Sequence, residues 1–125
     1  MTTTLRILRL LVAIVMFSSC SNDLQQRSDN QVSSLNGLAF AGFEIDENIM
    51  GKWSRSCALC HVNGEAGAPV IGDSADWRTR LDQGEETVMR NVLNGYKSMP
   101  PLGYCMACEL DDFRALIGFM AGTSR

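Results

Sequence analysis

Five consecutive residues, Cys57-Ala58-Leu59-Cys60-His61, place two thiols three positions apart and follow them at once with an imidazole. This spacing is what covalent attachment of a c-type haem requires. In the first turn of a helix the two thiols project on the same side, where each can add to one haem vinyl group. His61 is the only histidine in the chain, and its imidazole can then serve as an axial ligand of the iron. The alternatives for the cysteines alone are a redox dithiol and half of a zinc site.

A haem iron held by one histidine needs a second axial ligand or keeps an open site, and the chain contains seven methionines. Met99 precedes Pro100 and Pro101, which stiffen the backbone and exclude a helix there. It lies 38 residues after His61, which is far enough for the chain to cross to the other haem face. We therefore expect Met99 to be the second ligand. The alternative is a loop methionine that caps the core.

A second C-x-x-C pair, Cys105 and Cys108, follows the methionine loop. Together with Cys57 and Cys60 it could form a four-thiolate zinc site, which would make the chain a structural zinc module. Against this, Cys60 and Cys105 are 45 residues apart, which is longer than the usual zinc-ribbon loop. A thioredoxin-type dithiol would need a βαβ context, which is absent from this sequence.

The chain opens with the pattern of an export signal, residues 1–20. Arg6 and Arg9 accompany an apolar run over residues 10–17, and Ser18-Ser19-Cys20 follow. The apolar run is too short and too early to be a good transmembrane span. A cysteine after two small residues resembles the bacterial lipobox, in which Cys20 would be lipidated and become the new N-terminus. Phe17 stands where the lipobox usually has leucine, so plain secretion and an uncleaved anchor are the alternatives.

Residues 21–43 begin as a polar stretch without an apolar pattern, which predicts a flexible tether between a lipid anchor and a folded domain of residues 44–125. Cysteines exported to an oxidising compartment become disulfides when they are close together. The expected location is the periplasm, with the outer membrane favoured because Ser21, and not an acidic residue, follows Cys20. Once residues 1–20 are removed, the chain has 9 basic and 14 acidic residues, a formal charge of −5. This charge argues against nucleic acid as a partner, because phosphate binding needs a basic face.

The sequence of residues 44–125 predicts an all-α domain of about four helices around one haem. Ile45, Ile49, Trp53 and Cys57 recur every fourth residue, which predicts a helix that leads into the haem motif with Asp46 as its N-cap. Three further helices are predicted from Asp73 through about Leu81, from Glu85 to Asn94 and from about Leu110 to Ala121, the last two ended by Gly95 and Gly122. A domain of this size has a thin core, and a covalently held haem would supply the missing apolar mass.

These motifs together resemble the cytochrome c5 family of bacterial class I cytochromes c, over about Met50 to Met120. The matching motifs are Cys57-Ala58-Leu59-Cys60-His61, Gly67-Ala68-Pro69, Gly72-Asp73, Trp77 with Arg80, Leu93-Asn94-Gly95, Met99-Pro100-Pro101-Leu102-Gly103 and the Cys105/Cys108 pair. The resemblance implies the small class I cytochrome c fold and one haem c bound covalently to Cys57 and Cys60. It also implies that His61 and Met99 are the axial ligands, that Pro69 offers its carbonyl to the His61 ring, and that Cys105 and Cys108 form a disulfide.

One position departs from the family pattern. The family usually has a glycine eight residues before the first haem cysteine, and this chain has Ile49 there. In class I cytochromes that glycine lets the first and last helices cross closely. The departure predicts either a wider crossing or a replacement role for Gly51.

An iron ligated by histidine and methionine has no open position for a substrate, which predicts a monohaem electron carrier and not an enzyme. Redox proteins of the periplasm or membrane are the expected partners, and Lys52, Arg55 and Lys97 are candidates to orient them near the haem edge. Trp77 and Arg80 are candidates to hydrogen-bond a haem propionate, a solvated helix-face charge being the alternative for Arg80. The alternative function is a haem-based sensor or enzyme with a labile methionine ligand, although no second histidine supplies a distal acid or base.

Overall fold

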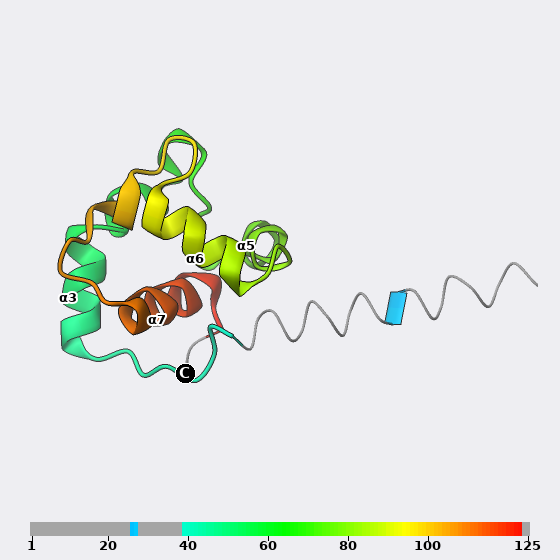
Figure 1. Cartoon of the computed structure of the whole chain (residues 1–125), viewed down its shortest axis with the longest axis horizontal. Coiled ribbons are helices and arrows are strands. Elements are labelled where there is room, and N and C mark those ends of the chain that lie inside the picture. Colours follow the sequence, from blue (N-terminus) through cyan, green and yellow to red (C-terminus); the bar gives the residue numbers. More distant parts are fainter. Residues whose placement is uncertain (1–25, 28–38, 124–125) are drawn as a thin grey trace, which may run out of the picture. The chain divides into compact units, whose positions relative to one another are not determined.

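The structure of the protein, a computed structural model, describes residues 26–27 and 39–123 (Figure 1). Residues 26 and 27 are helical and belong to a different unit from the domain of residues 39–123, and each is described by itself. The predicted signal peptide, Cys20 and most of the predicted tether lie outside the described residues. In the part of the chain that is described, no helix is both long and apolar enough to span a bilayer.

The domain is helical, and residues 39–123 contain no strand beyond a single bridge between Tyr96 and Met99. Its elements in chain order are α3 (Glu47–Arg55), α4 (Ala58–His61), η1 (Glu65–Gly67), α5 (Ser74–Leu81), α6 (Glu85–Asn94), η2 (Pro101–Tyr104) and α7 (Leu110–Ala121). The predicted all-α class is confirmed, with the haem motif occupying a short helix of its own.

Helices α3, α5 and α7 each begin where a side chain satisfies the first backbone N–H groups, while α6 begins at Gly84 without a side-chain cap. Asp46 accepts a hydrogen bond from the Ile49 N–H at 2.8 Å, and Asp73 accepts from the N–H groups of Ala75 and Asp76. Helix α7 opens with a reciprocal capping box between Glu109 and Asp112. Gly122 ends α7 in the left-handed conformation that glycine adopts without a steric penalty.

Helix α7 lies at the centre of the core. Its predicted apolar face is buried, with Phe113, Leu116, Ile117 and Met120 each 4% exposed or less. Figure 1 shows α7, in orange and red, flanked by α3 and α6, and it contacts both of them as well as α5. Trp53 of α3 packs edge-on against Phe119 of α7, with ring centroids 5.5 Å apart.

The predicted boundary between tether and domain at residue 44 is placed too late. Phe40, inside the predicted tether, is completely buried, and its carbonyl accepts a hydrogen bond from the Thr123 hydroxyl at 3.4 Å. A Cβ on Gly118 of α7 would lie 2.0 Å from the Phe40 carbonyl oxygen, so only glycine permits this approach. Residues 39–43 therefore belong to the folded domain.

The close backbone approach on α7 is at Gly118, and Gly51 does not take a comparable role. The atoms nearest to a Cβ at Gly51 belong to the Arg55 guanidinium, at 3.1 Å, on the same helix. Ile49, at the family's glycine position, is buried in the core. The wider crossing of the first and last helices stays a prediction.

Candidate haem site

The haem motif forms a single helical turn. Cys57 has helical backbone angles and directly precedes α4, and its carbonyl accepts from the N–H groups of Cys60 and His61 at 3.2 and 3.0 Å. Both thiols are unpaired, Cys57 being buried and Cys60 half-buried. Burial raises the pKa of Cys57 above its ordinary value of 9.0, so this thiol is neutral in the absence of a thioether bond.

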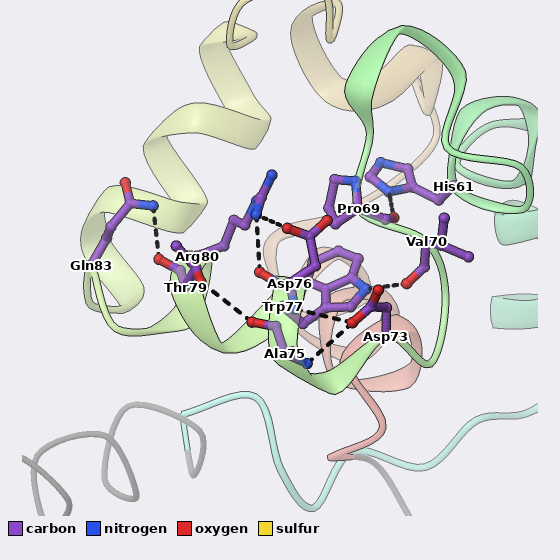
Figure 2. A network of polar contacts seen from close by, with 10 residues as sticks. All are labelled: His61, Pro69, Val70, Asp73, Ala75, Asp76, Trp77, Thr79, Arg80 and Gln83. Atoms are coloured by element: carbon purple, nitrogen blue, oxygen red, sulfur yellow. Dashed lines mark hydrogen bonds and ion pairs between the residues drawn. The ribbon is translucent and has the colours of Figure 1, made fainter.

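His61 is buried and oriented by a backbone carbonyl. Its Nδ1 lies 2.8 Å from the Pro69 carbonyl oxygen (Figure 2). A carbonyl can only accept, so Nδ1 carries the proton and Nε2 is left unprotonated, in the form that can bind a metal. Burial lowers the pKa of His61 below its ordinary value of 6.5, against a smaller opposing effect of the Pro69 hydrogen bond. Because the effect of burial is the larger one, the net pKa is lowered and the imidazole stays neutral, which is the form that binds iron.

Trp77 of α5 supports His61 by stacking. Their ring centroids are 5.6 Å apart with an interplanar angle of 28°. The indole Nε1 donates to the Val70 carbonyl at 2.9 Å, so the adjacent carbonyls of Pro69 and Val70 hold the two rings (Figure 2). The only side-chain N–H of Trp77 is therefore already used, which corrects the expectation that Trp77 donates to a haem propionate.

Arg80 lies one turn beyond Trp77, and both residues line a cavity next to His61 that is described below. Its Nη1 donates to the carbonyl of Asp76 at 3.1 Å and pairs with the Asp76 carboxylate, four residues earlier on the same helix (Figure 2). These contacts use one of the two terminal nitrogens of the guanidinium. A hydrogen bond from Arg80 to a propionate stays a prediction.

One cavity of about 360 Å³ brings His61 and Met99 together. Its buried apolar walls come from α5, α6 and α7, and more exposed polar side chains also line it. The buried apolar lining residues are Trp77, Val88, Val92, Ile117 and Met120, and the polar ones include Thr79, Arg80, Gln83, Asn91, Lys97 and Ser98. An apolar interior with polar groups around it suits a haem, whose ring is apolar and whose propionates are charged.

Residues 95–105, here called the methionine loop, are built closely around Met99. The Tyr96 N–H donates to the Met99 carbonyl at 3.0 Å, and the Met99 N–H donates back to the Tyr96 carbonyl at 2.9 Å. Gly95 has a φ of +84°, and a Cβ there would lie 2.9 Å from the Met99 carbonyl oxygen. A Cβ on Gly103 would lie 3.2 Å from the methyl carbon of Met99. Glycines on both sides therefore make room for this residue.

The second cysteine pair is a disulfide in this structure, with the Cα atoms of Cys105 and Cys108 5.4 Å apart. Two of the four thiols needed for a zinc module are thereby used. Among the described residues, no group of three or more histidine, cysteine, aspartate or glutamate side chains could hold a metal ion. The zinc alternative is not supported.

The three candidate docking cations have different surroundings. Lys52 is only 16% exposed in its side chain and forms an ion pair of 2.6 Å with Asp112 of α7, so it serves to hold two helices together. This corrects its expected role towards a partner. Lys97 lines the cavity and lies 5.2 Å from the centroid of the Tyr96 ring, and Arg55 is exposed at the end of α3.

Comparison with known proteins places this site in a family. The family described as cytochrome c oxidase, cbb3-type, subunit III matches residues 47–120, from α3 almost to the end of α7. Cytochrome c5 of Azotobacter vinelandii is 37% identical over 83 residues, which cover 65% of this chain and 96% of that relative. The chain belongs to the cytochrome c5 family of class I cytochromes c.

Two further similarities agree with this assignment to cytochrome c5. Cytochrome c-555 of Chlorobaculum tepidum is 44% identical over 77 residues, which cover 58% of this chain and 71% of that relative. A chain in the crystal structure of an electron transfer complex of nitrite reductase with cytochrome c matches with a TM-score of 0.55 and 32% identity, covering 66% of this chain and all of that one. This cytochrome is therefore a monohaem electron carrier, and not an enzyme, with covalently bound haem c.

Proposed function

We propose that this cytochrome passes single electrons between redox proteins with its iron held by His61 on one side and Met99 on the other. The observation that carries the proposal is the shared cavity: both residues line it, and the Pro69 carbonyl leaves His61 Nε2 as the ligand nitrogen. Haem c bound there supplies reversible one-electron chemistry at iron.

The chain's own residues keep the ligand positions fixed while charge changes at the iron. Trp77 and Pro69 limit rotation of the His61 ring, and the paired backbone hydrogen bonds of Tyr96 and Met99 limit motion of the methionine. The apolar side chains of α6 and α7 exclude water from the interior. Methionine ligation in a dry site favours the reduced state and raises the potential.

Replacing Met99 tests the ligand set. Met99→Ala should keep covalent haem, because the thioether bonds do not depend on Met99. It should lose the near-infrared sulfur-to-iron charge-transfer absorption, lower the potential and let carbon monoxide bind to the reduced protein at neutral pH. The matched control is Met106→Ala, since Met106 is nearby but 79% exposed. An unchanged absorption band in Met99→Ala would show that another residue is the ligand.

We also propose export to the periplasm and a lipid anchor on Cys20. The support is sequence pattern alone: the basic and apolar start, Ser18-Ser19-Cys20, and the polar residues that follow. The anchor would hold the carrier near membrane-bound donors and acceptors. A relative seen in complex with nitrite reductase makes a reductase of that kind one candidate acceptor.

Fractionation tests the anchor. The wild-type protein should sediment with membranes, and Cys20→Ala should either be released or remain unprocessed. Ser21→Asp serves as the matched variant: it keeps the modified cysteine but should move the protein from the outer to the inner membrane in a Gram-negative host. A soluble wild-type protein whose mature N-terminus is not Cys20 would overturn the proposal.

A further inference from the structure

Two loops meet at the mouth of the haem cavity. Residues 62–73, here called the histidine loop, carry the Pro69 carbonyl that orients His61, and the methionine loop carries Met99. Figure 1 shows the green histidine loop and the yellow-orange methionine loop side by side beyond α6. The Ser98 hydroxyl donates to the Ala66 carbonyl at 3.0 Å, across 32 residues of sequence. Ser98 and Ala66 both line the cavity.

This hydrogen bond is the only one between the two loops within residues 39–123. The other hydrogen bonds of the two loops stay within one loop, involve the residues that directly follow it, or reach a helix. The Pro69 carbonyl, for example, bonds His61, and the Gly72 N–H bonds the Met120 carbonyl of α7 at 2.8 Å. The contact between Ser98 and Ala66, here called the clasp, therefore ties the supports of both ligand residues directly to each other.

Unusual backbone conformations occur on both sides of the clasp. Ala66, which provides the acceptor, has a φ of +52°, and Lys97, just before the donor Ser98, has a φ of +53°. Residues with a Cβ avoid this left-handed region, and they remain in it where the surrounding structure imposes it. Both loops thus adopt a disfavoured conformation next to the one hydrogen bond that joins them.

We propose that Ser98 is a positioning residue for Met99, acting through the clasp. The proposal rests on the proposed role of Met99 as an iron ligand. Residues 96–99 form a rigid unit, because Tyr96 and Met99 exchange two backbone hydrogen bonds. Ser98 fixes this unit to the loop that orients His61, so both ligands keep their positions relative to each other. Without the hydroxyl, the unit can swing outward and Met99 leaves the iron more often.

The size of the effect follows from the kind of bond. A neutral hydrogen bond between partly hydrated groups changes an equilibrium about two- to tenfold. In Ser98→Ala holoprotein, we expect carbon monoxide to bind the reduced iron about two- to tenfold faster than in wild type, because binding must wait for Met99 to leave. Imidazole should bind the oxidised iron more tightly by a similar factor.

Two variants separate positioning from general stability. Ser98→Thr keeps the hydroxyl and should restore wild-type ligand exchange. Ser54→Ala removes a comparable exposed hydrogen bond, from the Ser54 hydroxyl to the Gly51 carbonyl at 3.1 Å, far from the methionine loop in sequence. Ser54→Ala should therefore leave carbon monoxide and imidazole binding unchanged.

Three outcomes would overturn the role of Ser98. The first is wild-type ligand exchange in Ser98→Ala with an unchanged denaturation midpoint, the second is the same ligand exchange with a lowered midpoint, which would indicate a purely structural role, and the third is the same acceleration in Ser54→Ala. Failure of the underlying proposal is seen separately, because Met99→Ala would then retain the charge-transfer absorption that wild-type protein shows. The absorption of Met99→Ala is accordingly recorded before the Ser98 variants are compared.

Discussion

The two C-x-x-C pairs have the same spacing but different chemistry. Cys57 and Cys60 form no disulfide, and Cys60 lines the haem cavity together with His61. Cys105 and Cys108 form a disulfide between the methionine loop and α7. Two intervening residues bring two sulfurs close together, and the neighbouring elements then decide what the sulfurs can react with.

The backbone around each pair accounts for the difference. Cys57 has helical angles, φ −57° and ψ −39°, and leads into a helical turn that ends at His61. Cys105 follows three residues with positive φ, two of which, Leu102 and Tyr104, are not glycine. Left-handed residues with a Cβ are each disfavoured by about 1–2 kcal/mol, so this turn needs a constraint from outside. The first pair therefore presents its thiols to a cofactor, while the second closes a short loop directly after a strained turn.

Removing the first pair should have the largest effect. Cys57→Ala/Cys60→Ala should abolish covalent haem and leave the cavity of about 360 Å³ unfilled. Buried apolar side chains that line this cavity would then face water instead of the cofactor, and a small domain has only about 5–15 kcal/mol of stability to offset that loss. We expect a colourless chain with little helix, as measured by haem staining after a denaturing gel and by circular dichroism.

The second pair supplies the control for that experiment. Cys105→Ser/Cys108→Ser removes the same number of sulfur atoms but should retain haem staining and helical content. Haem that stays covalently bound to the Cys57/Cys60 variant, or haem that is lost from the Cys105/Cys108 variant, would contradict the division of roles between the pairs.

Within the second pair, the expected effect is smaller and local. A disulfide that closes such a short loop gives little chain-entropy stabilisation, about 1–2 kcal/mol at most when scaled down from longer loops. Its main consequence should be on the methionine loop, because Cys105 follows Met99 by six residues. The double serine variant should still transfer electrons but lose the charge-transfer absorption at a lower denaturant concentration than wild type.

A substitution between the two cysteines distinguishes the effect of the disulfide from the effect of the residues that it encloses. Met106→Ser changes an exposed residue between the two cysteines and leaves both sulfurs in place. It should match wild type in the denaturant titration. Two free thiols in the untreated native protein, or a loss of electron transfer to the partner with undiminished methionine ligation, would contradict a structural role.

The helices of this domain could be predicted from sequence because their signals are local. The predicted bounds of α6 and α7 agree with the structure, since each combines an apolar stripe, acidic residues in the first turn and a glycine at the end. The burial of Phe40 could not be predicted, because it depends on Gly118, which lies 78 residues later in the chain. No local pattern near Phe40 indicates that contact.

The site shows the same division between local and distant causes. His61 is marked by its motif, and Met99 by the two prolines that follow it. The partners of Trp77 and Lys52 could not be predicted, because the Val70 carbonyl depends on loop conformation and Asp112 lies 60 residues away from Lys52. The clasp between Ser98 and Ala66 could not be predicted either. It depends on the left-handed backbone of Ala66 and Lys97, and alanine and lysine are not residue types that indicate this conformation.

The smallest expected effect concerns the ion pair that joins the helices next to the two cysteine pairs. Lys52 belongs to α3, which leads to the first pair, and Asp112 belongs to the first turn of α7, which follows the second pair. Their charged groups are 2.6 Å apart, and the Asp112 carboxylate also accepts from the Glu109 N–H at 2.7 Å. Burial alone would raise the pKa of Asp112, but the Glu109 hydrogen bond and Lys52 outweigh it and lower the pKa below its ordinary value of 3.8.

A lowered aspartate pKa gives stabilisation that is complete above the ordinary value and is lost as the pH falls through the lowered one. The free energy of unfolding of wild-type holoprotein should therefore decline below pH 3.8 partly through protonation of Asp112. Asp112→Asn should be less stable at pH 7 and should lose less stability between pH 5 and pH 2, as measured by denaturant titration at each pH. Asp111→Asn removes an equal charge from the same helical turn, together with its own ion pair to Arg114, but leaves the contact between Asp112 and Lys52 intact, so the acid-dependent loss that comes from Asp112 should remain. Equal acid dependence in Asp112→Asn and wild type would mean that the two helices are held together by their apolar contacts, such as Trp53 against Phe119, without help from the ion pair.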